Sequence, residues 1–551
     1  MDNRRLILLT IFAFSIFMLW EGWGKYNQPP AAPATTAQTP GASASPDAQA
    51  NIPRATGNLS GDSAIPAAAA AAASTAPTIT VRTDTMVADI SAEGGDIVRL
   101  ALTHYKATGD KSKNFVLLDN GTKHIYTAQS GLTGQGLPNH KTRFALPEGE
   151  QVLADGADSL TVRLSAPEVN GVAVDKLLTF HRGSYVVDVA YEIRNNGDTP
   201  VKTDAYFQFQ RDGEPAESVK AMGVSTFTGP AFYTDAAKFQ KVTFAHIDDN
   251  SAKFAKKDDN GWVAMVQHYF VSAYLPEQGV QREYFARKIA DNLYTAGVIL
   301  PVNEVAPGTT ATLSTRLYAG AQEQAHLKAI APGLDLVVDY GWLTVIAAPL
   351  FWVLQWFHNL TGNWGWAIIL VTVCLKAIFF PLSAASYKSM AKMRTLGPRL
   401  QRMKEQYGDD KVRMQKEMME IYKKEKINPL GGCLPIVVQI PVFIALYWVL
   451  LGSVEMRQAP WLGWITDLSV KDPYFILPII MGATMLIQMR LNPTPPDPMQ
   501  AKVMMAMPIV FTFMFLFFPA GLVLYWVVNN TLSIAQQWKI TKMIESGGKK
   551  T

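Results

Sequence analysis

The spacing of hydrophobic and polar residues changes several times along this chain of 551 residues. An apolar run near the N-terminus gives way to a stretch rich in Pro and Ala, then to segments in which apolar and polar residues alternate, and finally to long apolar runs. Strict alternation predicts half-buried β-strands, whereas apolar runs of about 18 residues or more predict membrane-spanning helices. The pattern therefore predicts a membrane protein of mixed α and β structure with a large water-facing β-domain.

The N-terminal apolar run predicts a signal anchor over residues 1–26. Residues 6–20 are apolar or small, and the sequence LWEGW stands where a cleaved signal peptide would have small residues. Two arginines before the run favour a cytoplasmic N-terminus. Residues 27–77 contain too few large apolar residues to form a core, which predicts a flexible tether.

Alternating segments within residues 78–338, among them SLTVRLSA, YVVDVAYEI and DAYFQFQ, predict a large antiparallel β-sandwich. Clusters of Gly, Asn, Asp and Pro separate these segments, as is typical of turns. The two cysteines of the chain, Cys374 and Cys433, lie outside this region, so we expect its stability to come from its own core instead of from disulfides.

The distribution of charge predicts the topology of the later apolar segments. Residues 388–426 contain twelve Lys or Arg and six Asp or Glu, and a short basic loop between spans stays in the cytoplasm. The chain must reach this loop from the outer β-domain in a single crossing, for which we assign the segment at 364–387. The apolar segment within 339–360, which contains three tryptophans, is therefore expected to lie along the outer interface as an amphipathic helix.

The last apolar run, residues 503–538, is too long for one crossing. As one helix of about 36 residues it would span about 54 Å, against a hydrocarbon core of about 30 Å. The sequence PAG at 519–521 predicts a turn that joins two crossings. We therefore expect an anchor followed by a five-span core over 361–540 and a basic cytoplasmic tail over 541–551.

The cytoplasmic loop is expected to form a helical hairpin over about 398–427, with the sequence YGDD as its turn. Its methionines suit packing within the hairpin, or an adaptable surface for varied apolar segments. Its basic residues suit contact with anionic lipid, or with ribosomal RNA. Sequence alone leaves both alternatives open.

The candidate functional site is a lysine within an apolar segment. Lys376 lies in VTVCLKAIFF, near the middle of the segment at 364–387, where a charge costs about 3 kcal/mol or more. Snorkelling towards the headgroups would relieve this cost, and so would a buried ion pair, although the other core spans contain no Asp or Glu. The favoured interpretation is a hydrated cavity. Thr372 lies one helical turn away on the same face, and Gln439 and Asn529 supply polar groups from other spans.

The common sequence signatures of catalysis are missing from the chain. It contains no HExxH zinc motif, no phosphate-binding Walker loop, no GxGxxG after a strand and no GxSxG nucleophile elbow. We therefore expect no enzyme activity, no cofactor and no metal site.

Several segments of the C-terminal region resemble the membrane-protein insertases of the YidC/Oxa family. The resemblance rests on NPLGGCLPIVVQIPVFIALYWVL at 428–450, APWLGWITDLSVKDPYFILPIIMG at 459–482, DPMQAKVM at 497–504 and FPAGLVLYWVVNN at 518–530. The long β-domain behind an anchor is similar to that of the Gram-negative members. The resemblance implies an insertase and folding chaperone of the inner membrane, with a supersandwich-like periplasmic β-domain and with both termini in the cytoplasm.

The resemblance also implies a hydrophilic intramembrane groove. In the family a positive residue, usually arginine, attracts the polar part of a client while the apolar part leaves into lipid, and Lys376 occupies that position here. Thr372 and the pair Tyr525 and Trp526 match positions of client contact. The candidate groove residues are Lys376, Thr372, Tyr525, Trp526, Gln439 and Asn529. Implied partners are nascent membrane proteins, the lipid bilayer, the Sec translocon, and the ribosome and signal-recognition machinery at the hairpin and tail.

Two other functions remain open on sequence grounds. A small-solute transporter would use Lys376 as an anion site, but inverted repeats, which many such folds contain, are not evident among the spans. A glycan-binding or glycan-modifying protein would use the β-sandwich as its working part, because sequence alone does not exclude paired catalytic carboxylates.

Overall fold

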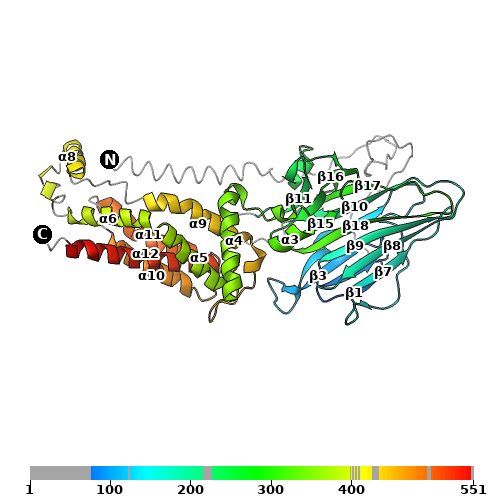
Figure 1. Cartoon of the computed structure of the whole chain (residues 1–551), viewed down its shortest axis with the longest axis horizontal. Coiled ribbons are helices and arrows are strands. Elements are labelled where there is room, and N and C mark those ends of the chain that lie inside the picture. The colour runs from blue at the N-terminus through cyan, green and yellow to red at the C-terminus, as the bar shows by residue number, and fades with distance from the viewer. Residues whose placement is uncertain are drawn as a thin grey trace, which may run out of the picture. The chain divides into compact units, whose positions relative to one another are not determined.

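The computed structural model describes residues 76–547 apart from short segments at 122–123, 215–225, 397–398, 400–401, 404–405, 408–409, 425–433 and 493–497. The predicted signal anchor, nearly all of the predicted tether, Cys433 and the end of the basic tail lie outside the described residues. The described chain divides into a β-rich unit that ends at Val337 and a helical unit that begins at Val338 (Figure 1). The predicted order, a large β-domain followed by helices, is confirmed.

The β-rich unit contains two sheets. One has ten strands in the order β13-β16-β17-β10-β5-β4-β3-β2-β1-β6, and the other has eight in the order β12-β11-β14-β15-β18-β9-β8-β7. Neighbouring strands pair antiparallel, except that β1 and β6 pair parallel. The strands are β1 (Thr78–Arg82), β2 (Met86–Ser91), β3 (Ile97–Lys106), β4 (Asn114–Asn120), β5 (Ile125–Leu132), β6 (Gln151–Val152), β7 (Ser159–Ser165), β8 (Val172–His181), β9 (Val186–Asn195), β10 (Asp204–Asp212), β11 (Gly229–Thr234), β12 (Lys238–Lys241), β13 (Lys257–Asp258), β14 (Trp262–Val266), β15 (Phe270–Leu275), β16 (Arg282–Ala290), β17 (Leu293–Pro301) and β18 (Thr310–Ala321). Short helical elements are α2 (Phe244–Asp248), α3 (Gln324–Ile330) and η1 (Leu334–Val337).

Aromatic side chains pack between the two sheets. Phe207 and Phe209 of β10 point to the same face of their strand, two residues apart. The ring centroid of Phe207 lies 6.3 Å from that of Tyr191 in β9, and the ring of Phe209 stacks on Tyr274 of β15 at 4.7 Å. All four side chains are almost completely buried. The alternation read in DAYFQFQ therefore places these rings in the core.

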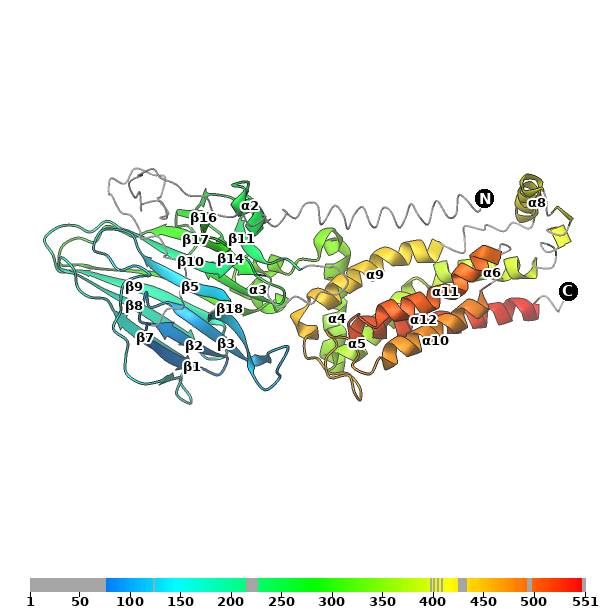
Figure 2. The ribbon, with the colours of Figure 1, turned by 180° about the vertical axis from the view of Figure 1, so that it is seen from behind.

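The helical unit contains a bundle and a helix that crosses one end of it. Helices α5, α9, α10, α11 and α12 run alongside one another, and α4 lies across them (Figures 1 and 2). Helix α4 packs against α5 and α9. The helical elements are η2 (Gly341–Leu343), α4 (Thr344–Thr361), α5 (Trp364–Ile378), α6 (Phe380–Thr395), α8 (Lys411–Lys424), α9 (Leu434–Gly452), η4 (Val454–Met456), α10 (Ile476–Leu491), α11 (Pro498–Phe515) and α12 (Ala520–Gly547).

The apolar segment at 364–387 forms two helices instead of one straight span. Helix α5 ends at Ile378, helix α6 begins at Phe380, and the two are bent by 65°. Pro381 explains the break, because proline has no N–H for the carbonyl four residues earlier and its ring clashes with that carbonyl. The bend follows directly after Lys376.

By length and hydropathy, no single helix within the described ranges qualifies as a membrane span, whereas α5 and the first part of α6 qualify together as a bent pair.

The long C-terminal apolar run is divided between α11 and α12, with the break at the predicted turn. The backbone N–H groups of Ala520 and Gly521 donate to the carbonyls of Val470 and Leu468, with N–O distances of 2.7 and 3.0 Å. These bonds satisfy donors that the first turn of α12 would otherwise leave unpaired. The loop between α9 and α10 therefore holds the start of α12.

The same loop also packs against the start of α5. The Asn363 side chain accepts hydrogen bonds from the backbone of Gly365 and Trp366 and donates to the carbonyl of Pro460 at 2.9 Å. A Cβ at Gly365 would lie 2.1 Å from the Trp461 ring, so only glycine permits this approach. This end of the bundle is therefore covered by packed loop residues.

Candidate functional site

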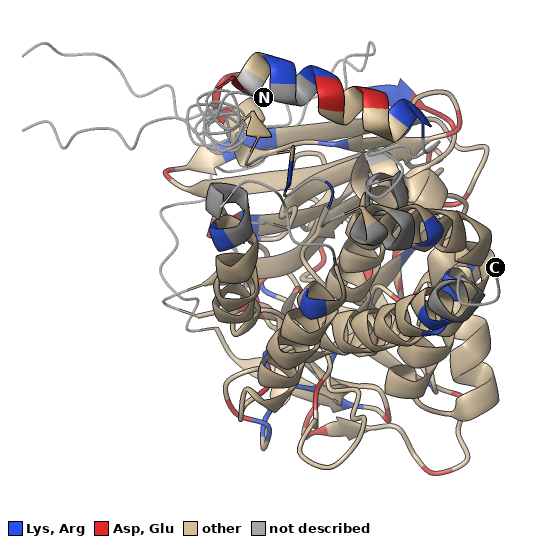
Figure 3. Cartoon of the chain, turned by 90° about the vertical axis from the view of Figure 1, so that its left-hand side faces the viewer, with Lys and Arg blue, Asp and Glu red and all other residues tan. Residues whose placement is uncertain are grey.

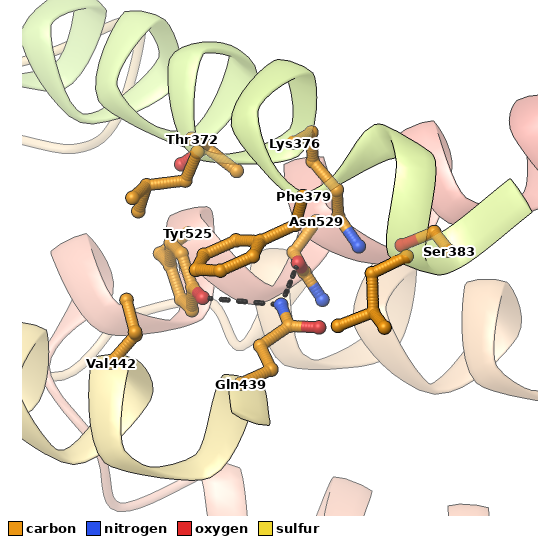
Figure 4. A pocket seen from close by; sticks show the side chains of 10 residues that line it. Thr372, Lys376, Phe379, Ser383, Gln439, Val442, Tyr525 and Asn529 are labelled. Atoms are coloured by element: carbon orange, nitrogen blue, oxygen red, sulfur yellow. Dashed lines mark hydrogen bonds between the residues drawn. The ribbon is translucent and has the colours of Figure 1, made fainter. Parts of the chain in front are cut away.

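A pocket lies beside the bend between α5 and α6 (Figure 4). Side chains from the α5–α6 segment, α9 and α12 line it. The lining residues are Thr372, Leu375, Lys376, Phe379, Leu382, Ser383, Gln439, Val442, Tyr525 and Asn529. Its empty volume is about 380 Å³, including the part open to solvent. Five of the six candidate residues from the sequence are brought together here.

Lys376 is held inside this pocket by a neutral partner. Its side chain is 8% exposed, and its Nζ donates to the hydroxyl of Ser533 in α12 at 2.7 Å. The Ser533 hydroxyl donates in turn to the backbone carbonyl of Asn529 at 2.8 Å. Within the described residues no carboxylate pairs with Lys376. The geometry therefore differs from a snorkelling lysine and from a buried ion pair.

A second polar group spans the pocket between α9 and α12. Gln439 donates through Nε2 to Asn529 Oδ1 at 2.5 Å and approaches the Tyr525 hydroxyl at 3.5 Å (Figure 4). Tyr525 and Asn529 are one helical turn apart, so both face Gln439 from the same side of α12. The pocket thus offers amide and phenol groups beside the ammonium of Lys376.

Thr372 lines the pocket but its hydroxyl is already engaged. Thr372 Oγ1 donates to the carbonyl of Ile368 in its own helix at 2.7 Å. This back-bonding leaves the hydroxyl oxygen as an acceptor for another molecule.

Trp526 does not line the pocket. Its ring packs edge-on against Phe443 at 4.9 Å and against Phe515 at 5.7 Å, between α9, α11 and α12. Its neighbour Tyr525 faces the pocket instead, because adjacent residues on a helix point about 100° apart. A role of Trp526 in client contact remains a prediction.

Sequence reasoning missed lining residues close to Lys376. Phe379 and Ser383 follow it by three and seven residues, which is the spacing of one helix face. That signal was present in the sequence. The partnership between Lys376 and Ser533 joins residues far apart in the chain, and no local pattern indicates it.

Lys and Arg positions, coloured blue in Figure 3, occur on several of the helices, α8 among them. Among the described residues, Lys388, Arg490, Lys502, Lys539 and Lys542 lie in the stretches of α6, α10, α11 and α12 that reach the end of the helical unit that carries α8. The loop at the opposite end, residues 453–475, carries three acidic residues, Glu455, Asp467 and Asp472, and two basic ones, Arg457 and Lys471. The two ends of the bundle therefore differ in charge.

The arrangement can bind a polar or anionic chain segment. An ammonium has three N–H donors and Ser533 uses one, which leaves donors for a carboxylate or a peptide carbonyl. Within the described residues no group of His, Cys, Asp or Glu is arranged to hold a metal ion.

Two family models match the chain and together cover the described units. The model for the YidC periplasmic domain matches residues 78–353, and the model described as 60Kd inner membrane protein matches residues 356–547. The first corresponds to the β-rich unit and the beginning of α4, and the second to the end of α4 and the rest of the helical unit.

Curated relatives align over almost the whole chain. The membrane protein insertase YidC of Aromatoleum aromaticum is 67% identical over 547 residues, which cover 99% of this chain and 98% of the relative. The protein of the same name from Dechloromonas aromatica is 59% identical and covers 100% of this chain and 99% of the relative. A solved structure of an active YidC insertase, with its first transmembrane domain resolved, aligns over 84% of this chain and 94% of its own at 17% identity and a TM-score of 0.40. The resemblance read from sequence is confirmed by the relatives and the family models: this chain belongs to the YidC family of membrane protein insertases.

Proposed function

We propose that this chain integrates nascent proteins into the Gram-negative inner membrane through the pocket around Lys376, acting as insertase and folding chaperone, alone or with the Sec translocon. The observation that carries the proposal is the pocket itself. A buried ammonium is held by a hydroxyl, has spare donors and lies among polar side chains of α9 and α12. A client's polar or acidic segment can pair with this ammonium part of the way across the membrane.

The pocket reduces the cost of moving polar groups through a bilayer. A charged side chain at the bilayer centre costs about 3 kcal/mol or more, and a partner of opposite charge lowers this cost. The client's apolar residues can meanwhile leave towards lipid past exposed side chains of α11, such as Met505, Ile509 and Phe513. These residues recur at intervals of four, which is one face of the helix.

No nucleotide-binding motif is present in the sequence, so the driving force must come from elsewhere. Burial of the client's apolar surface in lipid supplies it, and the membrane potential adds to it for an acidic segment that moves outwards.

The charge and packing of the helical unit support the proposed topology. The basic end with α8 suits the cytoplasm, and the loop-covered end suits the periplasm. Helix α4 exposes Val345, Trp352, Trp356 and Leu360 on one side while it packs against the bundle on the other. An exposed apolar and tryptophan-rich face is typical of a helix at the outer interface. We infer six crossings with both termini in the cytoplasm.

The exposed side of α8 is the surface that we assign to the ribosome and the signal-recognition machinery. Val412 and Met419 lie on it with Lys416 and Lys423. The basic side chains can contact RNA phosphates, while the methionine offers an adaptable apolar contact.

The test replaces the insertase of depleted cells with this chain and its Lys376 variants. The measurement is the fraction of an acidic-tailed client that is accessible to external protease, at equal insertase abundance. We expect Lys376→Arg to retain insertion, Lys376→Ala to reduce it and Lys376→Glu to reduce it further by repelling the tail. Removal of an intramembrane charge should by itself favour the stability of the insertase, so a loss of insertion by Lys376→Ala cannot come from the removed charge destabilising the fold. Insertion by Lys376→Ala at the wild-type level would contradict the groove mechanism.

A further inference from the structure

We propose that Ser533 is a positioning residue that holds the Lys376 ammonium in the pocket and thereby sets the preference for acidic client segments. This inference rests on the proposed function. Ser533 lies in α12, its side chain is 3% exposed, and its Oγ is 2.7 Å from Lys376 Nζ. Within the described residues, this is the hydrogen bond that the Lys376 ammonium makes.

The Ser533 hydroxyl is fixed in direction. A hydroxyl has one proton and two lone pairs, and the proton of Ser533 is donated to the carbonyl of Asn529 at 2.8 Å. The lone pairs are therefore the part that faces Lys376. The Tyr387 side chain of α6 also hydrogen-bonds Ser533, so rotation of the hydroxyl would disturb hydrogen bonds on more than one side.

Lysine needs such an anchor more than arginine does. Its charge sits at the end of a flexible stem of four carbons, which can turn towards the headgroup region. The pocket lining is partly apolar, with Leu375, Phe379 and Leu382, and its amide side chains Gln439 and Asn529 are hydrogen-bonded to each other. Without Ser533, we expect the ammonium to leave the pocket for much of the time.

A neutral anchor preserves the charge for the client. A carboxylate at this position would hold Lys376 equally well but would cancel its charge in the pocket. A hydroxyl accepts one N–H and leaves the positive charge and the two other donors available. Serine at position 533 therefore fixes the position of the Lys376 ammonium and leaves its charge available to the client.

The experiment compares two clients that differ only in the charge of the translocated tail, one acidic and one neutral. The cells contain only the full-length insertase variant under test and no other insertase. The measured quantity is the ratio of insertion of the acidic client to insertion of the neutral client. The variants are Ser533→Ala, Ser533→Thr, Lys376→Ala and the double variant. Thr531→Ala is the matched control, since Thr531 lies on the same helix, is exposed, and back-bonds to the carbonyl of Val527 at 2.7 Å.

We expect Ser533→Ala to lower the ratio by about threefold to tenfold, the range that corresponds to the net contribution of one typical intramolecular hydrogen bond. Ser533→Thr, which retains the hydroxyl, should restore most of the ratio, and Thr531→Ala should leave it unchanged. The double variant should match Lys376→Ala, because Ser533 acts through the lysine.

Three results separate the possibilities. If Ser533→Ala keeps the wild-type ratio while Lys376→Ala lowers it, the role of Ser533 is refuted and the groove mechanism stands. If Ser533→Ala reduces both clients equally, the residue is structural and the inference is also refuted. If Lys376→Ala leaves the ratio unchanged, the proposed function itself fails.

Discussion

Two buried lysines in this chain are stabilised in different ways. Lys176, in the core of the β-rich unit, donates to Asp96 at 3.1 Å and to the carbonyl of Gly94 at 2.9 Å. Lys376, in the helical unit, has the Ser533 hydroxyl instead of a carboxylate. A lysine with a purely structural task is best buried with an opposite charge. The neutral partner of Lys376 therefore fits a lysine whose charge serves another molecule.

Near Lys176, a buried histidine links pH to the stability of the β-rich unit. Burial lowers the pKa of His140 to about 4, from an ordinary value of 6.5. The backbone N–H of His140 donates to the Tyr206 hydroxyl at 3.0 Å, and Nδ1 lies 2.6 Å from the same oxygen. In the neutral imidazole, Nδ1 can accept the phenolic proton. A protonated imidazole could no longer accept this proton, so the phenolic O–H would need another acceptor.

The prediction concerns the substitution His140→Gln. A group whose pKa is lower in the folded state stabilises the fold above its unfolded pKa, and this stabilisation is lost as pH falls from 6.5 to 4. For His140 it amounts to roughly 3 kcal/mol at most. The difference in free energy of unfolding between wild type and His140→Gln should therefore be largest near pH 7 and shrink towards pH 4. Urea unfolding of the fragment 76–337 across this range measures it.

The comparison with a variant is necessary because Asp96 acts in the opposite direction. Burial raises the pKa of Asp96, so its contribution to stability falls as pH rises over an overlapping range. The free energy of unfolding of the wild type alone would report only the sum of the His140 and Asp96 contributions. His246→Gln, at an exposed position, is the control. A difference for His140→Gln that stays constant between pH 7 and 4 would contradict the prediction.

At the scale of elements, two prolines stand at breaks between helices. The turn expected at 519–521 separates α11 from α12, because proline there was recognised as a breaker. The apolar pattern at 364–387 predicts one continuous span, whereas the structure has two helices there, bent by 65°, with Pro381 at the start of the second. The same rule of steric exclusion applies to both positions.

The pocket could be predicted only in part for a physical reason. Lys376 and Gln439 stand out in a single sequence because polar residues are costly within apolar segments. Which of them meet depends on the rotation and packing of separate helices, and one sequence does not contain that information. The outward turn of Trp526 towards Phe443, beside the pocket-facing Tyr525, is such a case.

The orientation of the turn between α11 and α12 can be tested by cysteine labelling. Ala520 is completely buried, so Phe517, which is 53% exposed, is the better position. With Cys374 and Cys433 replaced by serine, a cysteine at Phe517 should react with a membrane-impermeant maleimide added from the periplasmic side. A cysteine at Lys542 should react only after the membrane is opened. The reverse pattern would exclude six crossings with a cytoplasmic C-terminus.

At the scale of the whole molecule, the two units rely on different sources of stability. The β-rich unit has a core of buried aromatic and aliphatic residues and, within its described residues, contains no cysteine. The helical unit exposes many large apolar side chains on α4, α10 and α11, which water would not tolerate but lipid would. The β-rich unit should therefore fold in water without the rest of the chain.

The position at which the fragment ends is critical for this prediction. Leu327 of α3 and Leu334 of η1 are both 0% exposed, and Trp262 of β14 donates through Nε1 to the carbonyl of Pro332 at 3.0 Å. The last residues before Val338 thus complete the core of the sandwich. A fragment 76–337 should be soluble and should unfold in one cooperative transition in urea, followed by circular dichroism.

A shorter fragment, 76–323, is the matched comparison. It keeps all eighteen strands but exposes the surfaces that Leu327 and Leu334 cover, so its free energy of unfolding should be lower by roughly 3 kcal/mol or more. If 76–337 is insoluble or unfolded while the full chain folds, the β-rich unit depends on the membrane part and is not an independent domain. If both fragments have the same free energy of unfolding, α3 and η1 do not stabilise the sandwich and serve only as the connection to the helical unit.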